Sequence, residues 1–404
     1  MKFEFVDRNE KHSARIKVFG IGGGGGNAIN NMIAAKLKGV EFISANTDSQ
    51  DLERSSCPNR LQLGGNITKG LGSGADPEIG RLSGEESLNE VREAVSGADM
   101  VFITAGMGGG TGTGASPVVA RESKESGALT VAVVTKPFLF EGEKRMNRAL
   151  AGIDRLKKDV DTLIIIPNER LKAIGDKNAM FKDLIAKADE VLLNAVRGIS
   201  DLIMSNGFIN LDFADIKKVM GEMGTAIMGT GRRGGEKRAS EAAQEAINSP
   251  LLEDISISGA KGLLMNITAP PDITMDEIDE ACNYIKGEVD ENAEIFWGVV
   301  FDETMADEVQ ITVIATGIDQ DHYKKVVRLR DVTPDEAKDA WTVKVKGESM
   351  NEYDIPAFQR KKMEEAPSEP IEAEEPEPPR KGFFKRAFFK DNLDYPTFLR
   401  AKAD

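Results

Sequence analysis

The sequence predicts an α/β protein with a doubly wound, mostly parallel sheet, a long central helix, a second smaller α/β domain and a disordered tail. Three observations lead to this expectation. From Ile16 to Pro167, short β-branched runs alternate with glycine-rich turns and helical stretches. The stretch from Met180 to Ser205 then has no proline and keeps its apolar residues at helical spacing. After Gly317 the composition becomes acidic and proline-rich.

Five strands are expected in the first part of the chain, and several are apolar without alternation, as strands covered on both faces are. They are Ile16–Ile21, Glu41–Ala45, Met100–Thr104, Leu129–Thr135 and Thr162–Ile166. Alternation of strands and helices implies right-handed crossovers and a parallel sheet. The second part resembles another α/β unit, with strands at Leu263–Thr268, Ile295–Val300 and Val309–Ala315 and helices near Glu236–Ile247 and Met275–Gly287.

The expected division of the chain follows from these patterns. Residues 1–13 form an N-terminal extension, 14–179 the first α/β domain, 180–206 the central helix, 207–318 the second α/β domain and 319–404 the tail. Within the tail, residues 364–379 hold seven glutamates, five prolines and no basic residue, which is typical of disorder.

Composition excludes several classes of function. With 67 acidic and 52 basic side chains the formal charge is −15, which argues against a nucleic-acid binder. No apolar stretch reaches the length of a membrane span and the N-terminus is charged, so a cytoplasmic protein is expected. Two cysteines and two histidines are too few for a disulfide framework, a zinc site or a histidine triad, and no metal site built by the protein is expected. Carboxylates, backbone N–H groups, a Lys or Arg and a borrowed metal ion remain, a set that suits phosphoryl transfer.

A first glycine-rich loop, Gly20 to Asn27, lies between a strand and a helix expected to begin near Asn27. Its N–H groups and the positive end of the helix dipole predict an anion cradle. The loop also satisfies G-x-G-x-x-G through Gly20, Gly22 and Gly25, and Asp48 follows 23 residues later. An NAD-dependent oxidoreductase with a dinucleotide-binding domain is therefore an alternative at this point.

A second glycine-rich loop, Gly106 to Gly114, occupies the equivalent position after another parallel strand. Two such loops can hold one polyphosphate from both sides, and the hydroxyls of Thr111 and Thr113 can bind phosphate oxygens. A third segment, Gly70 to Pro77, is placed to close over a terminal phosphate. The oxidoreductase alternative leaves the second loop without a role.

The run Gly108–Gly114 resembles the signature of the tubulin/FtsZ superfamily of GTPases. Gly22–Asn27, Asn46–Asp48, Thr135–Phe138 and Asn210–Asp215 resemble its bacterial cell-division members in order and spacing, from about Ile16 to Gly317. The resemblance implies a GTP-binding, tubulin-like protein that polymerises head to tail, hydrolyses GTP to GDP and phosphate, and forms the ring at the division site on the inner membrane surface.

The resemblance also assigns roles to individual residues. The phosphates are expected to contact Gly23, Gly24, Gly25, Gly26 and Asn27, with Asn46 nearby, and Gly110, Thr111 and Gly112 of the second loop, with Ala75 near the γ-phosphate. Gly108, Gly109 and Thr113 of the second loop are also expected to bind the nucleotide. Glu141 and Arg145 are expected at the ribose and phosphates, and Asn168 and Asp189 at guanine, whose N1–H and amino group suit a carboxylate. Ile185 stands where the family usually stacks an aromatic residue on the base. Without the resemblance, Asn168 fits an ordinary turn, and Glu141 with Arg145 an exposed helical ion pair.

Hydrolysis is expected to need two subunits. From Asp189 to Ser205 a helix rises about 24 Å, so Asp212 and Asp215 lie too far from the phosphates of their own subunit. In a head-to-tail stack they would polarise the attacking water of the neighbour's nucleotide, with Asn210 supporting the loop and Mg²⁺, held mainly by the phosphates, offsetting charge. Helix capping by Asp212 or Asp215 is the alternative, and it corresponds to a nucleotide-binding scaffold that does not hydrolyse.

The tail contains a repeated peptide. Residues 354–362 and 394–402 share the frame D-x-P-x-F-x-R-x-K, and division adaptor proteins are expected to bind around Phe358 and Phe398. Between them, residues 380–390 carry five basic residues and four phenylalanines, a composition that suits direct contact with an anionic membrane. Duplication without function, and folding of residues 380–390 onto the glutamate-rich run, are the respective alternatives.

Overall fold

The computed structural model describes residues 14–174, 180–204, 209, 211–221, 224–252 and 257–318. The N-terminal extension, Asn210, the tail peptides and residues 380–390 therefore lie outside the described residues. Within the described part, no helix is both long and apolar enough to cross a membrane.

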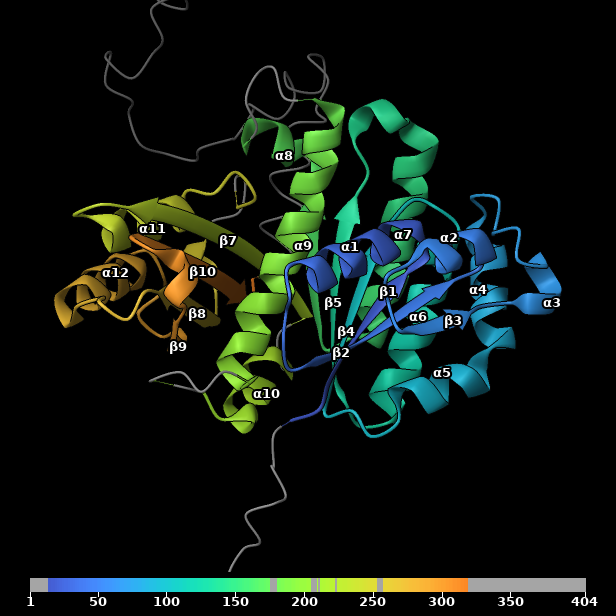
Figure 1. Ribbon diagram of the computed structural model, residues 1–404, viewed down its shortest axis with the longest axis horizontal. Helices are drawn as coiled ribbons and strands as arrows, with labels where there is room; N and C mark the ends of the chain where they lie inside the picture. Colours follow the sequence, from blue (N-terminus) through green and yellow to red (C-terminus); the bar gives the residue numbers. More distant parts are fainter. Residues whose placement is uncertain are drawn as a thin grey trace, which may run out of the picture. The chain divides into compact units, whose positions relative to one another are not determined.

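Among the described residues, ten strands form one sheet in the order β3-β2-β1-β4-β5-β6-β7-β10-β8-β9 (Figure 1). Neighbours from β3 to β7 are parallel, β10 is antiparallel to both β7 and β8, and β9 is parallel to β8. The strands are β1 (Ile16–Ile21), β2 (Val40–Asn46), β3 (Asn59–Gln62), β4 (Met100–Gly106), β5 (Leu129–Lys136), β6 (Thr162–Pro167), β7 (Gly224–Gly234), β8 (Gly262–Ala269), β9 (Glu294–Phe301) and β10 (Glu308–Thr316).

The helices cover both faces of the sheet. They are α1 (Gly22–Ala34), α2 (Ser49–Arg54), α3 (Gly65–Thr68), α4 (Pro77–Glu86), α5 (Leu88–Val95), α6 (Thr111–Glu125), α7 (Glu143–Asp159), α8 (Asn168–Ile174), α9 (Phe181–Met204), α10 (Phe213–Gly221), α11 (Arg238–Ile247) and α12 (Met275–Gly287). Single 3₁₀ turns occur at η1 (Leu139–Glu141), η2 (Ile257–Gly259) and η3 (Glu303–Met305). The α/β class and the mostly parallel sheet agree with the expectation from sequence.

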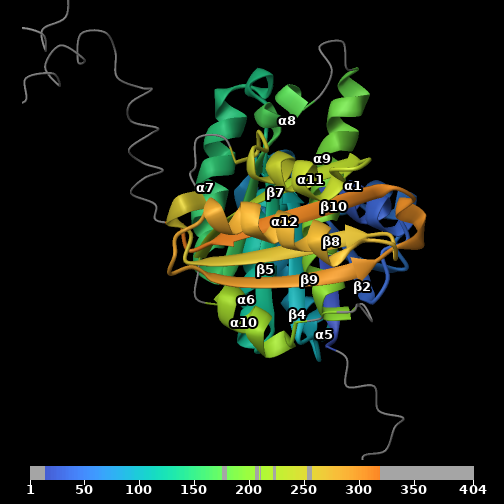
Figure 2. The ribbon, with the colours of Figure 1, turned by 90° about the vertical axis from the view of Figure 1, so that its left-hand side faces the viewer.

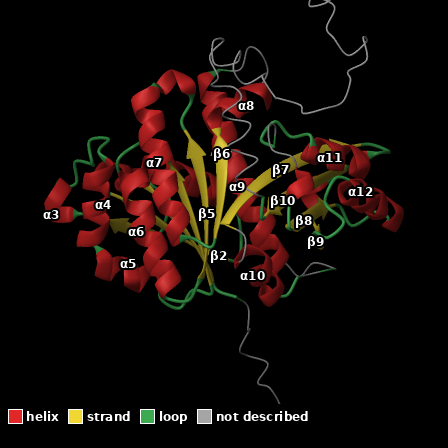
Figure 3. Ribbon diagram, turned by 180° about the vertical axis from the view of Figure 1, so that it is seen from behind, coloured by secondary structure: helices red, strands yellow, loops and turns green. Residues whose placement is uncertain are grey.

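Alternate residues of the central strands pack into two different hydrophobic cores, one on each face of the sheet. Ile16 and Val18 of β1 pack with α1, α9 and α10, whereas Phe19 and Ile21 pack with α5, α6 and α7 on the opposite face. Figure 1 shows α1 and α9 in front of the strands, and Figure 3, from behind, shows α5, α6 and α7. Burial on both faces is the reason why these strands read as continuous apolar runs.

The last four strands form a third core with α11 and α12, which Figure 2 shows on the side turned toward the viewer. Strand β7 was not expected from sequence, because four of its eleven residues are glycine. A Cβ on Gly229 or Gly231 would overlap with backbone oxygens of α11, so the helix packs directly onto the strand backbone. Glycine is required here by tertiary packing, and this overrides its low strand propensity.

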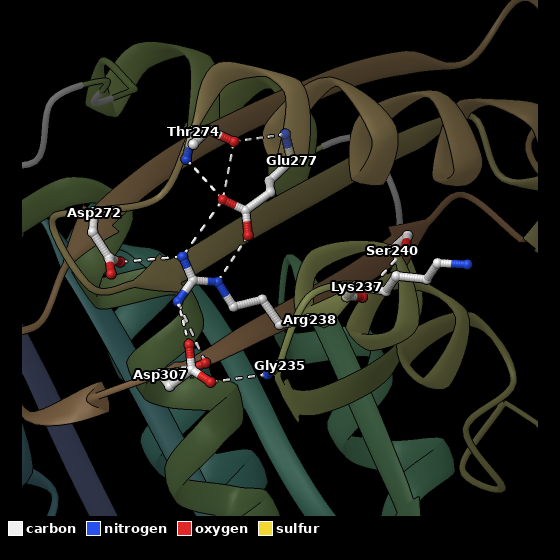
Figure 4. A network of polar contacts seen from close by, with 8 residues as sticks. All are labelled: Gly235, Lys237, Arg238, Ser240, Asp272, Thr274, Glu277 and Asp307. Carbon is white, nitrogen blue, oxygen red and sulfur yellow. Dashed lines mark hydrogen bonds and ion pairs between the residues drawn. The ribbon is translucent and has the colours of Figure 1, made fainter.

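Arg238 ties this part of the chain together (Figure 4). Its side chain is only 7% exposed and pairs with Glu277 at 2.8 Å, Asp307 at 3.0 Å and Asp272 at 3.1 Å. Glu277 also closes the capping box of α12 with Thr274. The guanidinium therefore joins the start of α11, the start of α12 and the turn before β10, and its hydrogen bond holds the pKa of Glu277 below the usual value.

One boundary differs from the expectation in a way that matters for the site. Helix α1 begins at Gly22 and not near Asn27, so the five glycines form the first turns of the helix. A Cβ on Gly25 would overlap with the carbonyl oxygen of Thr104 in β4 and lie 2.7 Å from the carbonyl carbon of Gly20. Glycine weakens a helix by about 1 kcal/mol, yet only glycine permits this close approach of α1 to the sheet.

Candidate functional site

The two glycine-rich segments meet where the order of the strands reverses. Strand β1 connects through α1 to β2 on one side, and β4 connects through α6 to β5 on the other. The strands β1 and β4 are adjacent and parallel, with Ile21 opposite Ala105 at their carboxyl ends. Open α/β sheets bind ligands in the crevice at such a switch point.

Backbone proximity explains glycines in both loops. A Cβ on Gly22 would lie 2.9 Å from the backbone nitrogen of Gly112, and a Cβ on Gly108 would lie 2.7 Å from the carbonyl oxygen of Arg145. Gly108 has a φ of +97° and donates its N–H to the Thr113 hydroxyl at 2.8 Å. Thr113 is buried, so its hydroxyl supports the shape of the loop.

Buried hydroxyl groups join three segments at the cradle. The Thr111 hydroxyl lies 2.6 Å from that of Thr47 and 3.1 Å from that of Ser73. Thr111 begins α6, Thr47 follows β2, and Ser73 belongs to the third segment, Gly70 to Pro77. Sequence reasoning missed Thr47 and Ser73, although Thr47 stands within the Asn46–Asp48 motif. Their contacts place the third segment directly against the second glycine loop.

Asn46 is buried at the end of β2 and has its amide oriented by two contacts. Its Nδ2 donates to Asp51 at 3.3 Å, and its Oδ1 accepts the Asp48 N–H at 3.2 Å. Asp48 itself caps α2 by accepting the Gln50 N–H at 2.9 Å. Asp48, whose spacing from Gly25 favoured the oxidoreductase alternative, therefore has a structural partner in α2.

Glu141 and Arg145 form an ion pair of 3.0 Å at the start of α7. Glu141 also accepts the Phe138 N–H at 2.8 Å, which folds the turn η1 back on itself. Phe138 stacks on Phe140, with ring centroids 5.1 Å apart. The structure thus confirms that Glu141 and Arg145 are paired, and it places Arg145 against the second glycine loop through Gly108.

Asn168 and Asp189 are partly or fully buried polar groups on two helices that pack together. Asn168 begins α8 directly after β6, is 8% exposed, and its Oδ1 has no hydrogen-bond partner among the described residues. Burial raises the pKa of Asp189 to about 6, and no neighbouring charge in the described part of the chain offsets this. Ile185 lies one helical turn before Asp189 and is half-buried. A buried oxygen and a desolvated carboxylate are suited to a ligand with N–H donors.

Asp212 and Asp215 lie at the start of α10, beyond the other end of α9. Asp212 is exposed and its carbonyl oxygen accepts the Asp215 and Ile216 N–H groups, so it occupies the cap position of α10. Figure 1 shows α8 beside one end of α9 and α10 beside the other. The 15 residues from Asp189 to Met204 separate the two sites by about 22 Å. The structure therefore does not bring Asp212 or Asp215 to the glycine loops of the same chain.

Apolar side chains are exposed around the cradle. Leu71 of the third segment is 80% exposed, and Leu139 and Phe140 of η1 are 66% and 61% exposed. A cavity of about 460 Å³ lies elsewhere, at the opposite edge of the sheet, where Arg15, Lys17 and Met204 are among its lining residues. The glycine cradle itself is bounded on its rim by apolar groups, as surfaces that contact another protein often are.

Comparisons with known proteins agree with this geometry. Residues 15–176 match the family described as Tubulin/FtsZ family, GTPase domain, and residues 224–319 match FtsZ family, C-terminal domain. The chain is 47% identical over 409 residues to the cell division protein FtsZ of Pseudomonas aeruginosa, with both chains covered completely. It is 55% identical over 304 residues to the cell division protein FtsZ of Magnetospirillum gryphiswaldense. This match covers 75% of this chain and 54% of the relative, so the chain spans about half of the relative's length.

Two solved structures extend the comparison. An empty FtsZ dimer of M. jannaschii has 45% sequence identity and a TM-score of 0.74, and the match covers 76% of this chain and 89% of that one. CetZ2 from Haloferax volcanii has 17% identity, a TM-score of 0.64 and coverage of 81% and 99%, which shows the shared fold alone.

Proposed function

This chain belongs to the tubulin/FtsZ family of GTPases and is related to the bacterial cell division protein FtsZ, and we propose that it polymerises head to tail and hydrolyses GTP at each subunit junction. The observation that carries this proposal is the separation of about 22 Å along α9 between Asp189 and the end of the helix that leads to Asp212 and Asp215. A single chain holds a nucleotide cradle at one end and the carboxylates of Asp212 and Asp215 at the other. Only a second copy can complete the site.

The cradle suits the phosphates of GTP. The first turns of α1 and the start of α6 direct backbone N–H groups and two helix dipoles toward the crevice. We assign the phosphates to Gly23–Asn27 and Gly108–Thr113, with Asn46 beside them and Ala75 of the third segment near the γ-phosphate. Mg²⁺, held mainly by phosphate oxygens, would neutralise part of their charge.

Guanine is assigned to Asn168 and Asp189. The desolvated Asp189 carboxylate would accept hydrogen bonds from N1–H and the amino group, and adenine lacks this pair of donors. The unpartnered Oδ1 of Asn168 would be satisfied by another donor of the nucleoside. Glu141 and Arg145 border the ribose side, and Ile185 offers an aliphatic contact to the base in place of an aromatic ring.

Hydrolysis is assigned to the neighbouring subunit. Asp212 and Asp215 would orient and polarise the attacking water at the γ-phosphate, and Asn210, outside the described residues, would support their loop. The exposed side chains of Leu71, Leu139 and Phe140 around the cradle support the same assembly, because a contacting subunit would bury them. A contact between unlike faces repeats from subunit to subunit, so it produces a filament.

Cellular roles follow as further parts of the proposal. The filament would form the division ring in the cytoplasm, on the inner membrane surface. The peptides around Phe358 and Phe398 would bind division adaptor proteins, and residues 380–390 would contact anionic lipid directly. The division into domains at 14–179, 180–206 and 207–318, with the tail from 319, also stays a proposal.

One experiment tests the function against its alternatives. The nucleotide released by heating the purified protein is identified, and light scattering and phosphate release are then followed after addition of GTP. We expect guanine nucleotide, a GTP-dependent rise in scattering and phosphate release that begins with assembly. Bound NAD would favour the oxidoreductase, and assembly without phosphate release would favour a scaffold.

A further inference from the structure

Arg148 is a cation beside the cradle. It lies on α7, nearly one turn after Arg145. Its Nε donates to the Lys144 carbonyl oxygen at 3.2 Å, which directs the side chain back along the helix. One of its terminal nitrogens, Nη1, donates to the carbonyl oxygen of Ala75. The side chain thus connects α7 with the third segment, Gly70–Pro77, which is 73 residues away in the sequence.

The segment that Arg148 reaches has an unusual backbone. Gly72, Gly74 and Ala75 have φ values of +83°, +61° and +62°. Ala75 is the non-glycine residue among these three, and L-residues rarely adopt this conformation. The turn is held from inside by the Asp76 N–H, which donates to the Ser73 carbonyl at 3.1 Å. Arg148 holds it from outside, at the carbonyl of the residue in the unfavourable conformation.

The contact between Arg148 and Ala75 also brings a positive charge to the cradle. The segments around the cradle contribute amides and acids, among them Asn46, Asp48, Asp51 and Asp76. Arg145 is already paired with Glu141 at 3.0 Å. Arg148 brings a full positive charge to Ala75, and its hydrogen bonds to Lys144 and Ala75 use two of the five guanidinium donors. The planar guanidinium is well suited to bind phosphate oxygens with the others.

We propose that Arg148 holds Gly70–Pro77 over a bound nucleoside triphosphate through Ala75 and binds the terminal phosphate directly with its remaining donors. The inference rests on the proposed function, in which Ala75 lies near the γ-phosphate. A diphosphate ends before this position, so it would gain little from Arg148. The residue would therefore distinguish GTP from GDP and couple the presence of the γ-phosphate to the conformation of a segment that carries the exposed Leu71 at the rim.

The test is equilibrium binding of fluorescent GTP and GDP analogues to the full chain, below the concentration at which it assembles. We expect Arg148→Gln to weaken GTP binding about tenfold or more, as the loss of a hydrogen bond to a charged group does. GDP binding should change less than threefold. Arg148→Lys should recover part of the GTP affinity, because an ammonium supplies charge but no planar pair of donors. Arg155→Gln, an exposed position two turns later on α7, is the matched control and should leave both affinities unchanged.

Hydrogen exchange of residues 70–77 gives a readout that a general loss of stability would not reproduce. In the unaltered chain, GTP should protect these amides more than GDP does, and Arg148→Gln should abolish the difference. Equal losses for GTP and GDP, or no loss for either, would overturn the inference while leaving the proposed function intact. If the unaltered chain binds neither nucleotide, the proposed function itself fails.

Discussion

The pKa of Asp189 provides a quantitative test of base recognition. Burial raises this pKa to about 6 in the free protein. Bound guanine would place two N–H donors on the carboxylate and so lower its pKa, which makes nucleotide binding favour the ionised form. With a pKa near 6, about 90% of the carboxylate is ionised at pH 7 and about 10% at pH 5. The affinity for GTP should therefore fall about tenfold between these two pH values.

Asp189→Asn supplies the perturbation. Asparagine keeps one acceptor but turns a donor toward the donors of guanine, so affinity at pH 7 should fall by about 10- to 100-fold, as for loss of a charged hydrogen bond. The variant should also lose the component of pH dependence that comes from the carboxylate, and what remains measures the titration of the phosphates. Fluorescent GTP binding, measured from pH 5 to 8 below the assembly concentration, gives both numbers.

A second carboxyl group on α9 serves as the control. Burial also raises the pKa of Asp201 to about 6, but Asp201 lies twelve residues further along the helix, about 18 Å from Asp189. Asp201→Asn should keep the affinity and pH profile of the unaltered chain. If Asp189→Asn instead shows the full pH dependence, or binds GTP within twofold of the unaltered chain at pH 7, the assignment of Asp189 to guanine is wrong.

Three further predictions concern packing and the tail. Gly25→Ala should lower the free energy of unfolding by about 1–3 kcal/mol, because its Cβ would overlap with the Thr104 carbonyl oxygen, whereas Gly26→Ala should be neutral or stabilising, because its Cβ would lie 3.5 Å from the Ser44 hydroxyl oxygen. Thermal unfolding of the two variants without nucleotide compares these effects. Equal effects would contradict the packing argument. Phe398→Ala should weaken adaptor binding more than Phe358→Ala, because a leucine follows the terminal phenylalanine and a glutamine the inner one; equal losses in a pull-down would reject the ranking. A peptide of residues 380–390 should co-sediment with anionic but not neutral vesicles, and binding that survives replacement of its four phenylalanines by serine would refute the membrane contact.

The central strands could be predicted from sequence because burial on both faces leaves uninterrupted apolar runs. Strand β3 was not predicted because Asn59–Gln62 has only one apolar residue. Strand β7 was not predicted because its glycines are required by close packing against the backbone of α11, a contact that the sequence does not reveal. The start of α1 was misplaced for the same reason, since the need for Gly25 comes from Thr104 in β4. In β7 and at the start of α1, tertiary contacts outweigh local propensity.

The site divides along similar lines. Each glycine loop is a continuous stretch of sequence, and the two loops follow adjacent parallel strands, so their convergence follows from topology. The contacts of Thr111 with Thr47 and Ser73, and of Arg148 with Ala75, join segments 38 to 73 residues apart. No periodicity or motif predicts such pairs, because each depends on where the intervening elements pack.

Complementation between two inactive variants tests the shared site most directly. Asp212→Ala keeps an intact nucleotide cradle but lacks the carboxylate offered to a neighbour, and Thr111→Arg keeps the carboxylate but fills the cradle. Each variant alone should release phosphate at less than a few per cent of the rate of the unaltered chain. In an equimolar mixture, junctions that pair a good cradle with a good carboxylate should restore GTP hydrolysis well above the sum of the two rates. Normal turnover by Asp212→Ala alone, or a mixture in which assembly occurs without any gain in phosphate release, would contradict a catalytic site built from two subunits.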